Sequence, residues 1–467
     1  MAQVSILWFR RDLRLADQAA LCAAAGAGAV IPVYVLDDET PKHRRMGAAS
    51  RWWLNHSLAA LDKALRAKGS RLILRRGRSD KVLAELAAET GAREVHALRH
   101  YEPWWRNAER AAARTVTLNL HDGNYLAPPG SITTGAGTPY RIYTPFWRAL
   151  VQRMPPFGPL AVPVSIPAPE SWPESDRLED WELLPMRPDW ASGLRQEWTP
   201  GEEGALARLD AFLGHASLYE ERRNLPSLEG TSRLSPHLHF GEISPASVWH
   251  ALADLNTSAG PFLGELGWRD YAENVIFQLP DYGNRSARDA FARFPWRTGG
   301  EAEADLRAWQ QGRTGYPIVD AGMRQLWATG WMHNRVRMLA ASFLIKHLLI
   351  DWREGERWFW DTLVDADYAS NAVNWQWSAG SGVDANLFVR IMAPLSQSEK
   401  FDAAAYIRQW VPELAGLPDR EIHDPPPEKR PGTYPEMLIG HRFARERALA
   451  AHAKMKAGAS KTLREES

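Results

Sequence analysis

The first quarter of the chain alternates between short apolar segments and longer segments of helical periodicity, and this alternation restricts the fold most. Amphipathic helices are predicted at 50–68 and 79–90, the first with Leu54 and Leu58 on one face. Four apolar segments are predicted strands: VSILWF (4–9), AVIPVYVL (29–36), RLILRRG (71–77) and EVHALRH (94–100). Strands that alternate with helices form a parallel sheet covered on both faces. We therefore expect a doubly wound α/β domain in residues 1–128.

The first turn from strand to helix, RRDLRLAD, lacks the GxGxxG pattern of dinucleotide-binding folds. Gly26 and Gly28 precede a strand instead of following one. A dinucleotide site of the usual kind is therefore not expected, and this domain either binds another ligand or serves as a scaffold.

The composition changes after residue 128, and a chain of 467 residues is too long for one ordinary core. Residues 129–201 are rich in proline, glycine and tryptophan, which indicates an ordered connector. Residues 202–467 are expected to form an all-α domain that ends in a basic helix at 440–457. Its other predicted helices are 203–214, 244–255, 261–279, 318–329, 331–350 and 355–364.

The bulk composition excludes several classes of protein. The sequence has no apolar run of about 18 residues that would span a membrane, and its start lacks a secretory signal. The one cysteine, Cys22, excludes an internal disulfide and favours a cytoplasmic location. Because the formal net charge is zero, a polyanionic partner would have to bind a local basic patch.

Nine of the 22 tryptophans lie between Trp296 and Trp377. Tryptophan combines a large apolar ring with a polar N–H group and is easily oxidised. Such a cluster indicates either an aromatic core or redox and photochemical work. On the number of rings alone, we expect the core.

The string GTSRLSPHLHFGEIS (230–244) places hydroxyl groups and an arginine just before a predicted helix. Ser235 and Pro236 are suited to the N-cap and first turn. With Arg233 and free backbone N–H groups, this helix start is an anion site suited to a pyrophosphate. The alternative is an ordinary helix cap.

Two further helical segments place polar groups on one face. In FLGELGWRDY (262–271), Glu265, Trp268 and Arg269 share a face, either for a planar ligand or as a surface pair beside a core ring. In WMHNRVRM (331–338), Asn334, Arg337 and Met338 share one helix face, and Arg335 points away from it. An internal salt bridge would account for Arg337 but not for all of these residues.

The segment DADYASNAVNWQW (365–377) is the most specific one. Asp367 and Asn371 are four residues apart at a predicted helix start, and Asp365 precedes them. The segment lacks the glycine of a calcium-binding loop, so no metal site is expected.

In this order, the motifs resemble the photolyase/cryptochrome family, and in particular its bacterial members that reverse cyclobutane pyrimidine dimers. The similarity extends from WFRRDLRLAD near the N-terminus to VPEL (411–414). It includes GTSRLSP, TGYPIVDAGMRQL (314–326), TGWMHNRVRM, DWREGERWFW (351–360), NWQWSAGSG (374–382) and QSEKFD (397–402).

The resemblance implies an FAD cofactor in the helical domain. Asn371 is expected beside the reactive edge of the isoalloxazine ring. Arg337 is expected to pair with Asp365 and to favour a negatively charged reduced flavin. The matching positions are Tyr219, Thr231, Ser232, Arg233, Leu234, Ser235, Trp268, Arg337, Asp365, Asp367 and Asn371.

It also implies light-dependent repair, in which excited reduced flavin donates an electron to a dimer flipped out of UV-damaged DNA. Glu265 would bind the thymine carbonyl edge, and Trp377 would stack on the bases. Asn334 and Met338 complete the catalytic residues of the lesion pocket. The DNA-binding positions are Arg223, Arg269, Arg335 and Gln397. We expect a monomer that needs no protein partner and no membrane.

The resemblance divides the tryptophan cluster. Trp375, Trp352 and Trp296 match the chain that carries electrons from the surface to the flavin. Packing roles are expected for the remaining rings: Trp309, Trp327, Trp331, Trp358 and Trp360.

The expected antenna site departs from a known pattern. Where folate-binding relatives carry an Asn–Glu pair after the segment matching Tyr101 and Glu102, this chain has Trp104 and Trp105. These rings either fill the pocket or stack on a folate held differently. We favour methenyltetrahydrofolate as the second chromophore, with a deazaflavin or an empty pocket as alternatives.

Two other functions are possible within the family. A cryptochrome-like blue-light photoreceptor is the first, although the sequence ends soon after His441, without the long extension of many sensors. Repair of the (6-4) photoproduct is the second. It would use two histidines where this chain has only His333.

Overall fold

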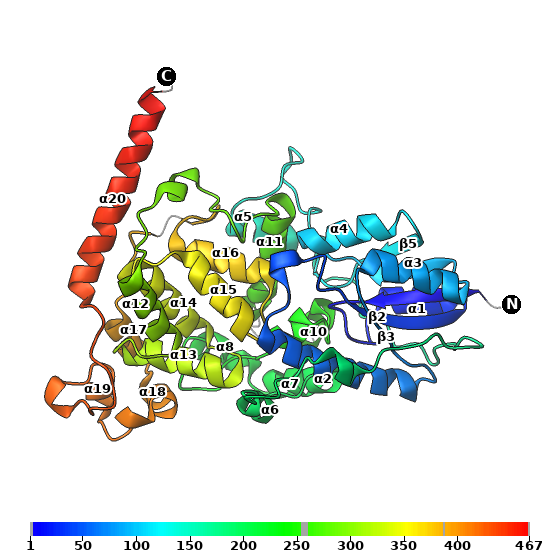
Figure 1. Cartoon of the computed structure of the whole chain (residues 1–467), viewed down its shortest axis with the longest axis horizontal. Helices are drawn as coiled ribbons and strands as arrows, with labels where there is room; N and C mark the ends of the chain where they lie inside the picture. The colour runs from blue at the N-terminus through cyan, green and yellow to red at the C-terminus, as the bar shows by residue number, and fades with distance from the viewer. Residues whose placement is uncertain (1–2, 254–259, 386–387, 466–467) are drawn as a thin grey trace. The chain divides into compact units, whose positions relative to one another are not determined.

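A computed structural model describes residues 3–253, 260–385 and 388–465 (Figure 1). Its contacts divide the chain into two compact units. The first, here called the sheet unit, comprises Met1–Ser217, Ser232–Pro280 and Val364–Ala369. The second, the helical unit, comprises Leu218–Thr231, Asp281–Leu363 and Ser370–Ser467. These units are groups of contacts, and the domain boundaries at 128 and 201 stay a prediction.

The sheet unit is built on a five-stranded parallel sheet with strand order β3-β2-β1-β4-β5. The predicted α/β class is confirmed. Every residue of β2 is buried, as expected for an apolar strand inside a parallel sheet. The strands are β1 (Val4–Phe9), β2 (Ala29–Leu36), β3 (Ile73–Arg76), β4 (Glu94–Leu98) and β5 (Thr117–His121).

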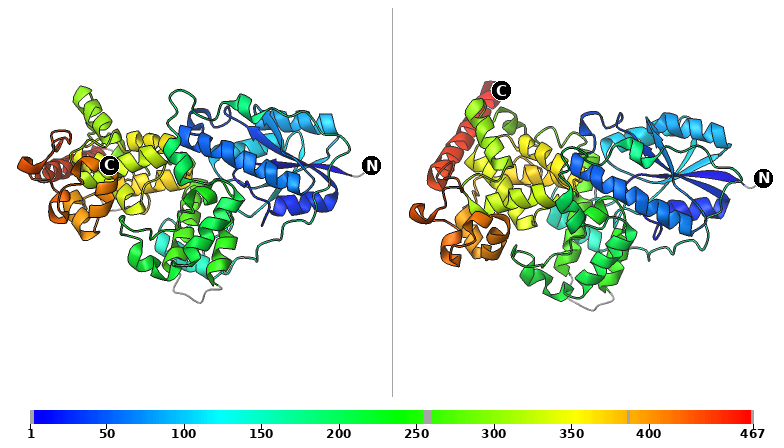
Figure 2. Two further views of the ribbon diagram at one scale, coloured as in Figure 1. Left: turned by 90° about the horizontal axis from the view of Figure 1, so that it is seen from below. Right: turned by 60° about the horizontal axis from the view of Figure 1, so that its bottom comes forward.

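Helices lie on both faces of this sheet (Figure 2). Strand β5 was not predicted because its side chains are partly exposed and its sequence is not a continuous apolar run. The predicted strands at 71–77 and 94–100 are shorter than expected. The covering helices are α1 (Ala19–Ala27), α2 (Ala48–Ala67), α3 (Ser79–Thr90) and α4 (Pro103–Ala112).

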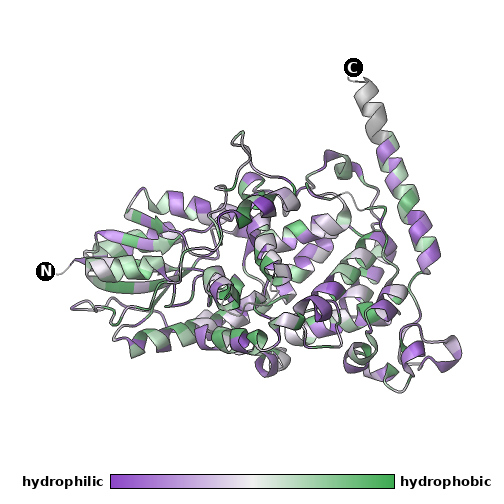
Figure 3. Cartoon of the chain, turned by 180° about the vertical axis from the view of Figure 1, so that it is seen from behind, coloured by the Kyte–Doolittle hydropathy of each residue, from purple (hydrophilic) through white to green (hydrophobic). Residues whose placement is uncertain are grey.

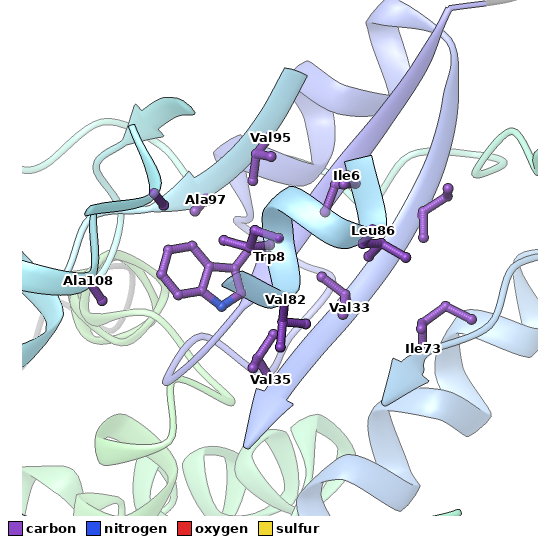
Figure 4. Packing of buried hydrophobic residues seen from close by; sticks show 13 residues of the cluster. Ile6, Trp8, Val33, Val35, Ile73, Val82, Leu86, Val95, Ala97 and Ala108 are labelled. Carbon is purple, nitrogen blue, oxygen red and sulfur yellow. The ribbon is translucent and has the colours of Figure 1, made fainter. Parts of the chain in front are cut away.

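One buried cluster joins the sheet to α3 (Figure 4). Val82 and Leu86 of α3 face Val33 and Val35 of β2. Trp8 is fully buried in the same cluster, and the Arg10 guanidinium lies 4.1 Å from the centre of its ring. This packing fixes the strand that leads into the RRDLR turn.

The predicted connector contains helices. Within 129–201 the structure has α5 (Tyr143–Val151), a 3₁₀ turn η2 (Leu178–Trp181) and α6 (Ser192–Glu197). These elements belong to the sheet unit, together with α7 (Glu202–Leu213), α9 (Ser235–His239), α10 (Pro245–Ala253) and α11 (Gly260–Gln278). Residues 254–255 of the predicted helix 244–255 lie outside the described residues.

The helical unit contains the remaining helices. Those that carry candidate residues are α8 (Tyr219–Arg222), α14 (Asn334–Ser342), α15 (Trp352–Thr362) and α17 (Pro394–Lys400). Helix α16 (Tyr368–Ala379) begins in the sheet unit and continues in the helical unit. The others are α12 (Gly300–Gln310), α13 (Pro317–Thr329), α18 (Ala404–Trp410), α19 (Asp419–Ile422) and α20 (His441–Glu465).

The prediction of one helix over 331–350 is wrong. Helix α14 begins at Asn334 because the His333 ring accepts the backbone N–H of Arg335 and caps it. It passes into a π-helical turn at Phe343–His347. The apolar periodicity of the sequence continues through the helix start at Asn334 and through the π-helical turn. It therefore could not reveal either feature.

Hydrophilic and hydrophobic residues are interspersed along the helices (Figure 3). Within the described part of the chain, no helix is long and apolar enough to cross a membrane.

The α3–β2 cluster generates a first prediction. Leu86→Ala should lower the free energy of unfolding by about 2 to 5 kcal/mol, because it leaves a cavity in a packed core. Urea unfolding followed by circular dichroism measures the change. Leu206→Ala is the control, since this leucine of α7 is 51% exposed and its loss should cost less than about 0.5 kcal/mol. Equal losses would contradict the assigned core.

Candidate functional site

The candidate residues are distributed over both units, and each unit brings its own members together. Arg337 belongs to the helical unit and Asp365 to the sheet unit, so their expected ion pair stays a prediction. Within the helical unit, Arg337 Nε donates to the carbonyl of Met332 at 2.7 Å, and its guanidinium lies 6.0 Å from the centre of the Trp331 ring.

In the sheet unit, Asp367 lies in a buried polar cluster. Its carboxylate is 3.2 Å from Arg11 and 3.6 Å from Nδ1 of His239. Arg11 also forms an ion pair with the buried Glu102. Burial alone would raise the pKa of the Asp367 carboxyl, but the His239 ring and the Arg11 charge outweigh it and hold this pKa well below its usual range.

The turn at Ser232–Ser235 differs from its predicted capping geometry. Ser235 is the first residue of α9, and Leu234 occupies the N-cap position without a side-chain cap. The prediction of Ser235 as the N-cap is therefore wrong. Ser232 Oγ accepts the N–H of Leu234 at 3.3 Å instead, and Arg233 has a left-handed backbone with φ of 51°. The Arg233 guanidinium forms an ion pair with Glu197.

Trp268 is held in an aromatic stack. Its ring lies 3.6 Å from that of Tyr143, with 9° between the planes. The Tyr143 hydroxyl donates to the carbonyl of Gly264 at 2.7 Å. A Cβ on Gly267 would lie 2.3 Å from the Trp147 ring, so only glycine allows this stack to pack on α11. The connector residue Tyr143 thus fixes one of the candidate flavin contacts.

Arg269, expected to bind DNA, is bound by the protein itself. Its guanidinium donates to the carbonyl of Asn124 at 2.5 Å and to that of Leu238 at 3.3 Å. It also lies 4.4 Å from the centre of the Tyr125 ring. These contacts favour a structural role, and binding of DNA by Arg269 stays a prediction.

Helix α11 carries two buried acids beside these residues. Asp270 accepts the backbone N–H of Ala127 at 3.1 Å, and Glu273 accepts the Tyr125 hydroxyl at 3.0 Å. Burial raises the pKa of Asp270 to about 7. Burial, with the negative charge of Asp367, raises that of Glu273 to about 7 as well. Both carboxyl groups therefore change charge near neutral pH.

In the helical unit, Asn371 is buried and oriented by one partner. Its Nδ2 donates to the backbone carbonyl of Glu356 at 3.0 Å and to Oε1 of Glu356 at 2.9 Å. The amide nitrogen is thereby fixed toward α15, so the amide oxygen has a defined direction. The helical spacing of candidate residues did not identify Glu356, since it lies on a different helix.

The three candidate electron-transfer tryptophans differ in exposure. Trp375 is 2% exposed and Trp352 is fully buried, whereas Trp296 is only partly buried. Trp375 lies 5.0 Å from Phe359, ring centre to ring centre. Trp352 Nε1 donates to the Ser286 hydroxyl at 3.3 Å. This order of burial is suited to a path from the interior to the surface.

The other rings do not share one role. Trp309 is fully buried and donates to the carbonyl of Ala340, as expected for packing. Trp327 is 57% exposed and stacks on Trp358 with ring centres 5.8 Å apart. The prediction of a core packing role for Trp327 is therefore wrong.

A basic cluster surrounds the start of α14. Arg335 donates to the Asn224 side chain at 2.6 Å and lies 3.6 Å from the Met338 sulfur, although helical spacing placed it on another face. Burial, with the positive charges of Arg223 and Arg390, lowers the pKa of Arg335. Arg390 was not singled out in the sequence, because it lies in a non-helical segment without a periodic pattern.

Other candidates have fewer described contacts. Tyr219 is buried under the Arg223 guanidinium, 5.1 Å from its ring centre. Thr231, Glu265, Trp377 and Gln397 are partly buried, whereas Asn334 is exposed. Among the described residues, no group of three or more metal-binding side chains is placed to hold a metal ion.

The two tryptophans of the expected antenna motif pack against the protein. Trp105 lies edge-on to Trp8 with ring centres 6.4 Å apart. Trp104 lies edge-on to Tyr368 at 4.9 Å. This packing supports the interpretation that the rings fill the position, without identifying a second chromophore.

Family models match two parts of the chain: DNA photolyase at residues 5–170 and the FAD binding domain of DNA photolyase at residues 262–454. The chain belongs to the photolyase/cryptochrome family, and its C-terminal half contains an FAD-binding domain. The predicted family and the predicted helical FAD-binding domain are confirmed.

The relatives include photolyases and cryptochromes. The deoxyribodipyrimidine photo-lyase of Agrobacterium fabrum is 48% identical over 97% of this chain and 98% of its own. A class III photolyase structure from Agrobacterium tumefaciens matches with a TM-score of 0.93 and 47% identity, covering 98% of each chain. Cryptochrome-1 of Arabidopsis thaliana is 38% identical over 90% of this chain and 64% of its own.

The buried acids of α11 generate a prediction about pH. Because burial raises the pKa of Asp270 to about 7, the folded protein retains a proton that the unfolded chain releases above about pH 4. Stability due to Asp270 is therefore present at low pH and is lost as pH rises toward 7. Asp270→Asn removes this titration, so its stability relative to the parent should rise by about 2 to 4 kcal/mol between these pH values.

Chemical denaturation at a series of pH values measures this difference. Asp210→Asn, at an exposed position of α7, is the control and should give a flat difference curve. A flat curve for Asp270→Asn as well would contradict the raised pKa.

Proposed function

We propose that this protein reverses cyclobutane pyrimidine dimers in UV-damaged DNA, in a light-dependent reaction with FAD as cofactor. The observation that carries the proposal is the similarity to a class III photolyase over 98% of both chains, in sequence and in fold. The similarity to a plant cryptochrome covers less of that protein and is weaker.

The side chains present are chemically suited to FAD. Hydroxyl groups at Thr231, Ser232 and Ser235 and the backbone N–H groups at the start of α9 fit a pyrophosphate and ribityl chain. Asp365, Asp367 and Asn371 supply acceptors and an amide for the polar edge of a flavin. A bound, reduced FAD excited by light would supply the electron that opens the dimer.

The protein's own groups hold and orient the reactants. Glu356 fixes the amide of Asn371, which leaves the Asn371 oxygen to accept a hydrogen bond from a neighbouring group. Glu265 would bind a base carbonyl, and Trp377 would stack on the flipped bases. Asn334 and Met338 would line the same pocket.

Backbone phosphates would bind the basic cluster. Arg223, Arg335 and Arg390 lie close enough together for their charges to interact, so the zero net charge of the chain does not prevent binding of DNA. Gln397 of α17 would add a neutral contact. We infer that this cluster, and not the field of the whole molecule, attracts DNA.

We include a second, light-harvesting chromophore in the proposal and leave its chemical identity open. Methenyltetrahydrofolate remains favoured, with a deazaflavin or no antenna as alternatives. Trp104 and Trp105 are in contact with Tyr368 and Trp8, so a folate would have to be held by groups other than the missing Asn–Glu pair. The absorption spectrum of the purified protein would distinguish these cases.

Repair of (6-4) photoproducts is less well supported. His333 would be one of the two catalytic histidines, but its ring accepts the backbone N–H of Arg335 and caps α14. The residue is also buried, with 3% of its surface exposed, which disfavours contact with a substrate.

The function is tested with purified protein, reduced FAD and DNA that contains defined dimers. Blue light should restore the DNA, and darkness should not. Glu265→Ala should lower the repair rate at least about tenfold, because one oriented hydrogen bond to the reacting base is lost, while FAD stays bound. Light-dependent signalling without repair would favour the photoreceptor alternative and overturn the proposal.

The tryptophan chain makes a separate prediction. Trp352→Phe should slow the light-driven reduction of oxidised FAD by about tenfold or more, because phenylalanine is far harder to oxidise. Absorbance of the flavin under illumination with an external reductant measures the rate. Trp309→Phe alters an equally buried ring and should leave the rate nearly unchanged. Similar losses in both variants would contradict a defined path.

A further inference from the structure

One short part of the C-terminal half belongs to the sheet unit. Residues Val364–Ala369 cluster with the sheet unit, whereas residues on both sides belong to the helical unit. This segment carries Asp365 and Asp367, two of the proposed flavin contacts. The contacts that retain it therefore determine where those carboxylates lie.

Several contacts retain the segment, and one of them comes from α4. The Tyr368 ring lies against Trp104, and the Arg44 guanidinium is 5.2 Å from its centre. The Tyr368 hydroxyl donates to the carbonyl of Pro280 at 3.1 Å. Asp367 pairs with Arg11, and Arg11 pairs with Glu102 at the N-cap of α4.

Arg11 is the central residue of this arrangement. Its side chain is 11% exposed, that of Glu102 1% and that of Asp367 12%. Two carboxylates buried so deeply require a compensating cation, and the removal of one partner of a buried pair is strongly unfavourable. Arg11 is the second residue after the end of β1, so the sheet restricts its position.

We infer that Arg11 is a positioning residue for the flavin: paired with Glu102, it holds Asp367 ionised and in place, so that the α/β half helps to build the FAD site. This inference rests on the proposed function, since it takes Asp367 as a contact of bound FAD. It gives the RRDLR turn a role besides that of a scaffold.

Charged and titratable groups face Asp367 from several elements. Arg11 follows β1, His239 comes from α9, and Arg269 and Glu273 come from α11. Tyr125 follows β5 and Asp365 belongs to the same segment as Asp367. Burial lowers the pKa of His239, so at neutral pH this ring is neutral and Arg11 supplies the nearest full positive charge.

The adjacent arginine provides a matched control. Arg10 is also buried and forms an ion pair with a buried carboxylate, Glu109, at 2.7 Å. Its described contacts lie with Glu109, Trp8, Trp105 and the carbonyl of Leu98, and not with the 364–369 segment. Arg10→Met therefore removes one buried ion pair from this turn, and Arg11→Met removes two.

The test measures FAD affinity of the full-length protein by fluorescence of released flavin. Arg11→Met should raise the dissociation constant about tenfold or more, because Asp367 then loses its nearest full positive charge and the partner that fixes its position. Arg10→Met should leave the dissociation constant within about threefold of that of the parent. Arg11→Lys keeps the charge and should restore most of the affinity.

Equal affinity in the two methionine variants, or no recovery of affinity in Arg11→Lys, would overturn the inference. If Arg11→Met does not fold, Arg11→Gln and Arg10→Gln decide: a weaker affinity only in Arg11→Gln supports the inference, and equal affinities overturn it. A parent protein that binds no FAD or repairs no dimers contradicts the proposed function. A parent that does both leaves the Arg11 result to be judged separately.

Discussion

Buried charge is the constraint on which much of the sheet unit depends, because a buried ion is unfavourable unless an opposite charge or hydrogen bonds compensate it. The chain meets this requirement with groups from distant parts of the sequence. Arg11, Glu102 and Asp367 form one such set. Arg10 and Glu109 form another, in the same turn. The two arginines of RRDLR thus pair with different buried carboxylates.

The general architecture could be predicted because it depends on local patterns. Continuous apolar segments located β1 and β2, and helical periodicity located α2 and α3. Prediction was weaker where the position of an element depends on contacts that its own hydrophobic pattern does not reveal. Strand β5 is partly exposed and has a mixed sequence. The break before Asn334 depends on the His333 ring.

The candidate residues could be identified by resemblance, whereas their partners could not. Nothing near Asn371 in sequence indicates that Glu356 fixes its amide, and nothing near Trp268 indicates the stack with Tyr143. At Ser235 a local pattern gave a wrong prediction. Serine before proline is typical of an N-cap, but here Ser235 is the first residue of α9. Contacts between residues distant in sequence determine these side-chain partners and helix starts, and they cannot be inferred from a single sequence.

The position of Val364–Ala369 in the sheet unit limits how the protein can be divided. A gene split at residue 128 or 201 would look reasonable from composition, but Asp367 would be synthesised apart from Arg11. The C-terminal fragment would contain a buried carboxylate whose cation is on the other fragment. The two halves are therefore not interchangeable modules, and a chimera with another α/β half would need an arginine and a glutamate at the positions of Arg11 and Glu102.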